Sequence, residues 1–514
     1  MGAIYHRTVL TGGGAGALDA IDGAGLNDGD LGFVRTSSWE LHSYILDADS
    51  GLTESSPQAI APDSNAGSKR WILLYTSALN APLQNLIINA DFGVWSNATI
   101  ETQGAAVKAD DCADDDTADW SKDTNTTLTF DTDHYELAAS DAGSNRYAKW
   151  TANYTPTVGR LYRLSLDVKD GTASSVAMHI SPQSQNPTQT YVKQFTTSSG
   201  FVTQTLVFEA RSSDNNFWIV LNTGTSGNNV EVKNITVYEV APGCIAADTA
   251  AADGHSKTST LDAYRVQADS THLAGYYGLK LVKGDAGAEY YNLNTITHAA
   301  LLDRYKGRTV AIACYVYDTA GSDDNIKLQI YDGVGTSSSG FATSSSKHWL
   351  EITRTIDASA TEITPRILCD GDAADVAYIS PVVMILGSAI GAGNQAPPPP
   401  RLLHLEQRIL LASYDGATVS ANAAINLTAE TEGKLPRAAA ILARISAICS
   451  TTDKYLALFR DDSGLTEGPR IDTLVANKAH SAGGPCSCNA GTLHLARDDT
   501  FTSVSIYISA VEVI

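Results

Sequence analysis

Cationic residues are scarce in this sequence. Its 514 residues include 35 Lys and Arg against 57 Asp and Glu, which gives a formal net charge of −22. Nucleic acid and anionic lipid repel a protein of this charge, so we expect neither as a partner. Charged residues make up only 18% of the chain, while hydrophobic residues make up 43%. The remainder is rich in small polar residues, which favours short strands and turns over charged amphipathic helices.

Cysteines and long apolar runs are scarce too. The seven cysteines are odd in number and scattered along the chain, which argues against a disulfide scaffold. No apolar stretch reaches the roughly 18 residues that a membrane-spanning helix needs. The first residues carry no apolar run typical of a signal peptide. We therefore expect no membrane insertion, and a chain that folds in the cytoplasm of the cell that makes it.

Signatures of catalysis are missing as well. No Gly-x-Ser-x-Gly motif with a later Asp and His is convincing, and the many short repeats of a β-helix do not occur. Asp and Glu are abundant enough for a glycosidase-type pair, but a sequence gives no distance between carboxylates with which to test one. We predict that the chain is not an enzyme, and we assign no catalytic residue.

Strand patterns are what the sequence does contain. Residues 85–95 (Asn-Leu-Ile-Ile-Asn-Ala-Asp-Phe-Gly-Val-Trp) are typical of a strand that opens a sandwich and fills its core with aromatics. Apolar and polar residues then alternate at period 2 in several segments, as half-buried antiparallel strands require. Turn residues separate these segments at the spacing of a sandwich. Residues 85–241 are predicted to form one β-sandwich.

The next segment, residues 242–390, repeats this order of elements. Residues 163–170 align with residues 310–318, and residues 217–224 align with residues 362–371, by pattern rather than by identity. The sequence therefore predicts a duplication that gives two tandem jelly-roll-like β-sandwiches.

Two smaller units flank the sandwiches and complete an all-β fold. Residues 1–78 contain short strand patterns and Gly/Asp turns, and we expect a small N-terminal β module there. Residues 413–514 are expected to form a C-terminal β domain. Its apolar final strand runs to Ile514 and needs a partner, which favours a closed or intertwined domain.

A proline-rich junction, residues 391–412, precedes the C-terminal domain. Four consecutive prolines predict a stiff spacer. The spacing of Leu402, Leu405 and Ile409 then predicts a short helix. This helix could pack on its own domain or line a three-fold seam between chains, and a single apolar stripe does not separate the two.

Aromatic side chains are the best candidates for ligand contacts. Tyr and Trp faces stack on the C–H face of sugars while neighbouring polar groups bind the hydroxyls. Trp150, Trp218 and Trp349 lie within strand patterns, and we expect them in the core. The candidate contacts lie in turns or beside polar clusters, and are Trp120, Tyr191, Tyr276, Tyr277, Tyr290 and Tyr291.

An acidic cluster places six aspartates within residues 110–119. One interpretation is a solvated acidic loop. The other is a structural Ca²⁺ that pins the loop, because oxygen-rich sites suit this ion. Its candidate ligands are Asp110, Asp111, Asp114, Asp115 and Asp116. No other cofactor is expected.

The N-terminal module resembles small modules of tailed-phage and phage-like virion proteins. The resemblance rests on several stretches, namely residues 17–23 (Ala-Leu-Asp-Ala-Ile-Asp-Gly), 26–30, 44–51, 54–57, 60–63 and 69–72. In that family such a module precedes fibre or spike domains. The resemblance therefore implies attachment to the virion through residues 1–78.

The two sandwiches resemble carbohydrate-binding-module-like jelly rolls. Residues 85–92 match the opening strand of such modules, and residues 232–238 (Val-Lys-Asn-Ile-Thr-Val-Tyr) match the closing strand. Sandwiches of this kind recur in phage tail fibres, where one face can hold a sugar chain.

Together the resemblances imply a structural fibre or spike subunit of a tailed phage or phage-like particle. It would be a homotrimer that folds in the host bacterial cytoplasm, joins the virion and binds a host cell-surface polysaccharide. The alternatives are a capsule-degrading depolymerase spike and a secreted carbohydrate-binding adhesin. The missing signal peptide argues against the adhesin.

Overall fold

The computed structural model describes residues 3–35, 41–50, 52–54, 56, 59–64, 67–76, 85–142, 146–150, 156–173, 176–181, 191–195, 198–210, 216–221, 226–267, 277–319, 325–342, 346–392, 401–415, 423–435, 440–449, 454–459, 470–473, 479–487, 492–497 and 501–513. Over these residues the protein is almost entirely β-structure, which confirms the all-β prediction. The α-helices found there, α1 (Ala299–Leu302) and α2 (Leu427–Glu430), are single turns. No helix of the described chain has the length and apolar character to cross a membrane.

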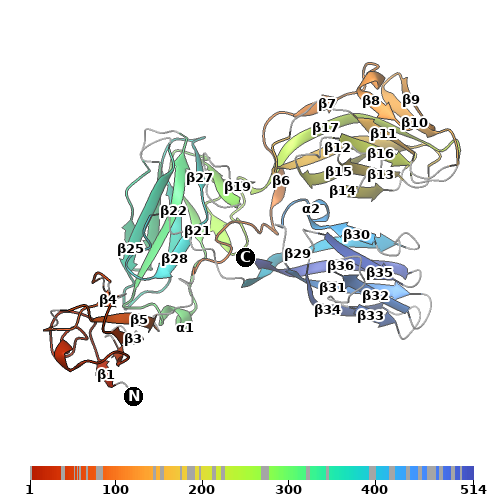
Figure 1. The fold of residues 1–514 in the computed structure, drawn as a ribbon. Helices are drawn as coiled ribbons and strands as arrows, with labels where there is room; N and C mark the ends of the chain where they lie inside the picture. The colour runs from red at the N-terminus through yellow and green to blue at the C-terminus, as the bar shows by residue number, and fades with distance from the viewer. Residues whose placement is uncertain are drawn as a thin grey trace.

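The N-terminal module is a five-stranded sheet at one end of the molecule (Figure 1). Its core contains the fully buried side chains of Trp71 and Tyr44. A 3-10 turn, η1 (Gly23–Gly25), is capped by the side chain of Asp22. The strands run in the order β1 (Ile4–Arg7), β2 (Leu31–Arg35), β3 (Leu41–Asp47), β5 (Arg70–Thr76) and β4 (Ala59–Ile60).

The first sandwich packs two sheets around a core that includes Trp150, Phe208 and Phe217. One sheet has the order β14 (Tyr191–Phe195), β13 (Val176–Ser181), β16 (Asn216–Leu221), β11 (Arg146–Trp150) and β8 (Trp120–Lys122). The facing sheet has the order β15 (Val202–Glu209), β12 (Leu161–Asp170), β17 (Asn229–Cys244), β10 (His134–Ala139) and β9 (Thr126–Asp131), with β6 (Thr99–Thr102) and β7 (Lys108–Asp110) added along β17. A 3-10 turn, η2 (Thr117–Asp119), leads into β8.

The second sandwich has the same sheet topology, which confirms the predicted duplication. One sheet has the order β24 (Thr336–Ser338), β23 (Ile326–Tyr331), β26 (Thr364–Cys369), β21 (Glu289–Leu293) and β18 (His255–Lys257). The facing sheet has the order β25 (His348–Thr355), β22 (Thr309–Asp318), β27 (Val376–Ile379), β20 (Tyr277–Val282) and β19 (Asp262–Gln267), with β28 (Val383–Leu386) beside β22. Strand for strand, these orders match those of the first sandwich.

The predicted boundary between the sandwiches is corrected by the contacts of residues 85–98, named here the opening segment. Its backbone runs beside β28, where the Leu86 amide donates to the Met384 carbonyl at 2.7 Å. The Asn85 side chain donates to the Val382 carbonyl at 2.6 Å. Phe92 and Trp95 are buried in the core of the second sandwich. The opening segment therefore begins the second sandwich, and the first sandwich is inserted within it.

The insertion enters and leaves at one point. Thr99 at the start of β6 is paired with Gly243 near the end of β17. Gly243 is also paired with Tyr264 of β19. These pairings join sheets of the two sandwiches into one 13-stranded sheet. The insertion was not predicted from the sequence, because an inserted copy and a tandem copy give the same order of strand patterns.

The C-terminal domain is a third sandwich of two four-stranded sheets. Its core includes Ile441, Leu456 and Ile506, together with Val94 from the opening segment. One sheet has the order β29 (Arg401–Asp415), β36 (Phe501–Val513), β31 (Ala440–Cys449) and β34 (Ala479–Ser487). The other has the order β30 (Ala423–Asn426), β35 (Thr492–Arg497), β32 (Lys454–Phe459) and β33 (Arg470–Thr473).

The predicted short helix in the leucine-rich stretch is wrong, because this stretch is strand β29. Leu403, Ile409 and Leu411 are buried in the C-terminal core, whereas Leu410 is 47% exposed. Their spacing is the period of 2 that a strand shows. The helical spacing was present by chance, and pairing with β36 decides the outcome. The prediction that this helix lines a three-fold seam between chains is therefore wrong as well.

Candidate functional site

Two of the predicted aromatic contacts are core residues, which corrects their assignment to a ligand surface. Trp120 is 8% exposed, and its ring stacks on Trp150 with 6.0 Å between centroids. Tyr291 is 0% exposed, and its hydroxyl lies 3.1 Å from Nδ1 of His255. Each side chain projects from a strand toward the core between the sheets, where a sugar has no access.

The other predicted aromatics are placed differently. Tyr277 is 8% exposed and lies under the guanidinium group of Arg265, 4.6 Å from its ring centroid. Tyr290 is half-buried on the outward face of β21. Tyr276 and the side chain of Tyr191 lie outside the described residues.

Asp110, Asp111 and Asp115 of the acidic cluster accept hydrogen bonds from backbone amides of their own loop. Asp110 accepts the Tyr135 hydroxyl at 3.1 Å and the Cys112 amide at 2.8 Å. Asp111 accepts the Ala113 amide at 3.1 Å, and the exposed Asp114, Asp115 and Asp116 follow in the same loop. Within the described part of the chain, no three carboxylate, His or Cys side chains gather as a metal ion requires. The calcium interpretation stays a prediction for experiment.

A row of polar side chains crosses the outward face of the β18–β21–β26–β23–β24 sheet. The row consists of residues paired from strand to strand, namely Ser256, Asn292, Arg366, Gln329 and Ser338. Nε of Arg366 donates to Oε1 of Gln329 at 2.8 Å, and Nε2 of Gln329 donates to Oγ of Ser338 at 3.0 Å. These bonds fix Arg366, Gln329 and Ser338 relative to one another before any ligand arrives.

Two tyrosines flank the polar row at Arg366. The guanidinium carbon lies 4.3 Å from the ring centroid of Tyr290 and 5.2 Å from that of Tyr331. Cation–π attraction holds the three side chains together. Both rings are half-buried, so part of each ring faces solvent. Nearby on the same face, the ammonium group of Lys327 lies 4.1 Å from the ring centroid of Phe341.

This face combines the groups that bind sugars. Aromatic rings stack on pyranose C–H groups, while fixed amide, guanidinium and hydroxyl groups bind the ring hydroxyls. Only Tyr290 was predicted from the sequence. The alternation in β23 places Lys327, Gln329 and Tyr331 outward and would have identified them. The position of Arg366 beside Tyr290 depends on strand register, which the sequence does not give.

The equivalent row in the first sandwich is buried where it crosses β16 and β13. Ser121, Lys149, Trp218 and His179 occupy the matching positions. Trp218 is only 1% exposed and His179 only 3%. Burial lowers the pKa of His179 to about 4, so this imidazole is neutral at pH 7. The two copies therefore share a fold, but their outward faces differ in chemistry.

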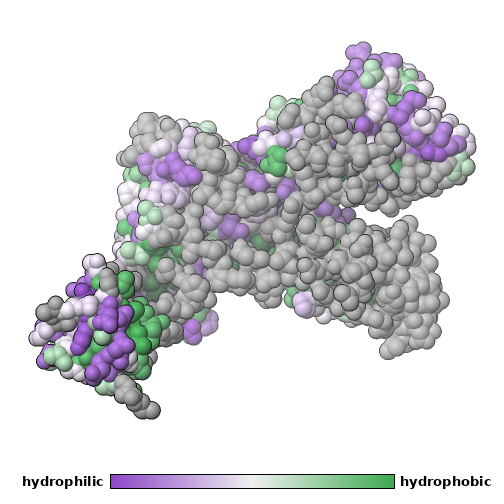
Figure 2. Space-filling model, in the orientation of Figure 1, coloured by the Kyte–Doolittle hydropathy of each residue, from purple (hydrophilic) through white to green (hydrophobic). Residues whose placement is uncertain are grey.

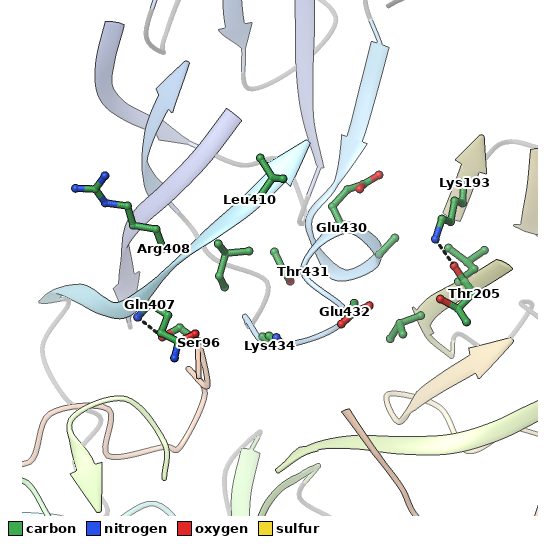
Figure 3. Close-up of a pocket in the computed structure, with 14 residues that line it drawn as sticks. Ser96, Lys193, Thr205, Gln407, Arg408, Leu410, Glu430, Thr431, Glu432 and Lys434 are labelled. Atoms are coloured by element: carbon green, nitrogen blue, oxygen red, sulfur yellow. Dashed lines mark hydrogen bonds between the residues drawn. The ribbon is translucent and has the colours of Figure 1, made fainter. Parts of the chain in front are cut away.

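A cavity of about 340 Å³ lies between the first sandwich and the C-terminal domain (Figure 3). Ser96, β29, α2 and β15 border it, and the amide of Gln407 donates to Oγ of Ser96 at 3.1 Å. Lys193 donates across its far side to the Thr205 carbonyl at 2.7 Å. None of the described lining residues is aromatic, so the cavity lacks a stacking surface.

Among solved structures, carbohydrate-binding modules are similar to parts of this chain. No family profile and no curated protein matches it. The N-terminal CBM22-1–CBM22-2 tandem domain of Paenibacillus barcinonensis Xyn10C is 11% identical, with a TM-score of 0.28, covering 57% of this chain and 100% of that one. A CBM4 structure is 13% identical, with a TM-score of 0.20 and coverage of 30% and 99%. TmCBM61 in complex with β-1,4-galactotriose is 13% identical, with a TM-score of 0.18 and coverage of 26% and 87%.

Proposed function

We propose that this protein binds a polysaccharide through the outward face of the β18–β21–β26–β23–β24 sheet. The observation that carries the proposal is Arg366, which sits between the rings of Tyr290 and Tyr331 and is hydrogen-bonded to Gln329. An arginine fixed in this way presents its remaining N–H groups beside two aromatic rings. Hydroxyl recognition and ring stacking are then available within one site.

Binding of neutral oligosaccharides to the full chain tests this proposal. Tyr290→Ala and Tyr331→Ala each remove one stacking ring, and we expect roughly five- to tenfold weaker binding for each. Tyr507→Ala is the matched control, because Tyr507 is 37% exposed on the C-terminal domain, away from this face. Equal affinity of all three variants and the unchanged protein would contradict the proposed face.

We further propose that the chain is a fibre or spike subunit of a phage-like particle, attached through residues 1–78. The support is the sequence resemblance of this segment to virion modules. Its described residues have a hydrophobic core of their own, centred on Trp71. Removing residues 1–78 should abolish incorporation into particles and leave sugar binding intact. Particles that still carry the shortened chain would contradict this attachment.

The proposal includes a homotrimer that binds sugar without cleaving it. Native mass measurement tests the oligomer, because a single chain has a mass of 54.3 kDa and a trimer has three times that mass. A monomer at micromolar concentration would count against the trimer. Incubation with a bound polysaccharide tests cleavage, and release of reducing ends would favour the depolymerase alternative.

A further inference from the structure

A second cleft lies where the two sandwiches meet, on the opposite sheet from the polar row. Its volume is about 510 Å³. It lies over the 13-stranded sheet at the junction of β17 with β19, and residues from β6, β12 and β20 also line it. The aromatic lining residues are Tyr264, Tyr277 and Tyr378. This cleft therefore has the stacking surface that the cavity of Figure 3 lacks.

An aromatic row continues from the cleft across the outward face of the second sandwich. Tyr264, Lys280, Tyr378 and Tyr317 stand opposite one another on the neighbouring strands β19, β20, β27 and β22. The Tyr317 and Tyr378 rings lie 6.3 Å apart, and the ammonium group of Lys280 lies 5.3 Å from the Tyr264 centroid. With strands about 4.8 Å apart, the row spans roughly 14 Å, the length of a short oligosaccharide.

The fold itself does not require aromatics at these positions. The equivalent row of the first sandwich consists of Thr129, Glu136, Glu231 and Lys169. That row occupies the same four strands of the duplicated sheet and contains no aromatic residue. Three tyrosines in one copy and none in the other indicate a role beyond packing of the sheet.

The charges in the cleft are unusual for a protein with a net charge of −22. Its charged lining residues are Arg160, Arg265 and Lys280 against the single carboxylate of Glu239. Arg160 pairs with Glu239 at 2.9 Å, and Arg265 donates to the Gly93 carbonyl at 2.7 Å and to the Gly433 carbonyl.

Among the described cations that line the cleft, Lys280 has neither a carboxylate nor a backbone carbonyl partner. Its ammonium group donates at 3.1 Å to Oε1 of Gln103, which is neutral. Over the described residues, no carboxylate lies within ion-pair distance of this ammonium group. Burial lowers the pKa of Lys280, while the more distant Glu239 and Asp262 oppose that effect. An anionic group that entered the cleft could form an ion pair with the Lys280 ammonium group.

We propose that the cleft and the adjoining aromatic row bind an oligosaccharide that carries carboxylate groups, such as a uronic-acid chain. A sugar carboxylate pairs with Lys280, and the sugar rings lie on Tyr264, Tyr378 and Tyr317. This site is separate from the face of the polar row, so either proposal can fail without the other.

Calorimetric titration of the full chain tests the cleft, with tetragalacturonate as the acidic probe and cellotetraose and β-1,4-galactotetraose as neutral probes. Lys280→Met should weaken tetragalacturonate binding at least tenfold, since hydrogen bonds to charged groups contribute about 1.5–3 kcal/mol. Tyr378→Ala should weaken it roughly fivefold. Lys306→Met is the matched control, because Lys306 pairs with Asp303 in a loop outside the cleft. Thermal melts of each variant check that it is folded.

The outcomes separate the two sites. Acidic binding that is lost in Lys280→Met, retained in Lys306→Met and weakened by added salt supports the cleft. No binding of tetragalacturonate, or equal binding by Lys280→Met, overturns it. Loss of acidic binding in Tyr290→Ala and Tyr331→Ala also overturns it, because the acid would then bind at the polar row. Loss of neutral binding alone in these two variants concerns only the proposed function.

Discussion

Replacing Asp332 by Asn should destabilise the second sandwich strongly. Asp332 is 0% exposed, and its carboxylate accepts two hydrogen bonds from Arg354, at 2.8 and 2.7 Å. It also accepts the backbone amides of Val334, Gly335 and Asp357 at 3.1, 2.9 and 3.1 Å. Burial alone would raise the pKa of Asp332, but these donors outweigh it and hold the pKa well below the usual range.

The magnitude follows from the loss of one partner in a buried ion pair. Such a loss costs about 3–5 kcal/mol. Asn keeps the shape and one acceptor, so we expect the lower end, about 3 kcal/mol. For a unit of this size, the melting temperature should then fall by roughly 6–12 °C. The same substitution at Asp303 is the control, because its 3.0 Å contact with Lys306 lies at the surface and is worth at most about 1 kcal/mol.

Calorimetry as a function of pH tests the reasoning. Because the folded pKa is depressed, the stability that this carboxylate contributes is fully present above its unfolded pKa of about 3.9. That stability is lost as the pH falls through the lower folded pKa. The difference between Asp332→Asn and the unchanged protein should therefore be constant above about pH 5 and shrink below about pH 4. A melting temperature for Asp332→Asn that matches that of Asp303→Asn would refute the account.

Three further outcomes are expected. Burial lowers the pKa of both His179 and His255 to about 4. On acidification the unfolded chain is protonated first, so each histidine lowers the free energy of unfolding by about 3 kcal/mol between pH 6.5 and pH 4. His179→Phe should therefore flatten the acid side of the pH–stability curve. EDTA should leave the melting midpoint unchanged, since Asp110, Asp111 and Asp115 already accept backbone amides. A lower midpoint in EDTA would favour the calcium interpretation. Gly433→Ala should lower the free energy of unfolding by at least about 1 kcal/mol, because Gly433 has φ +78° and an added Cβ would lie 2.5 Å from Cδ1 of Leu161. Chemical denaturation measures this change, and an unchanged stability would contradict the close contact between Gly433 and Leu161.

Local patterns in the sequence were sufficient for many strands of the two sandwiches and for the duplication, but not for β29, which was expected to be a helix. The alternation in β12 and in β17 follows from which residues face a core, and this is encoded locally. Surface faces were harder to predict. Tyr290 and Tyr291 are adjacent and chemically alike, and strand geometry requires one to face inward and the other outward. Which one faces inward depends on pairing with β26, and that contact lies more than 70 residues away in sequence.

Trp218 is a second residue whose facing direction was not predicted from the sequence. It lies in a strand pattern and was expected in the core, and it is only 1% exposed. Its side chain nevertheless belongs to the outward row, where the Tyr147 ring lies 4.7 Å away. The burial of a side chain and the face of the sheet on which it lies are separate properties, and a strand pattern does not distinguish them.

Hydrophilic residues of the same sandwich gather at the end formed by β8, β9 and β10 (Figure 2), as the acidic cluster of the sequence indicates.

The insertion of one sandwich into the other decides how the molecule carries mechanical load. Tension between the N-terminal module and the C-terminal domain first meets the opening segment, which is anchored on Met384 and buries Val94 in the C-terminal core. The chain enters and leaves the first sandwich at one point, where Thr99 pairs with Gly243, and the sandwich also packs against α2 of the C-terminal domain. Because the two ends of the insertion are paired there, a pull along the chain passes directly from one end to the other, and the sheets of the first sandwich carry little of it.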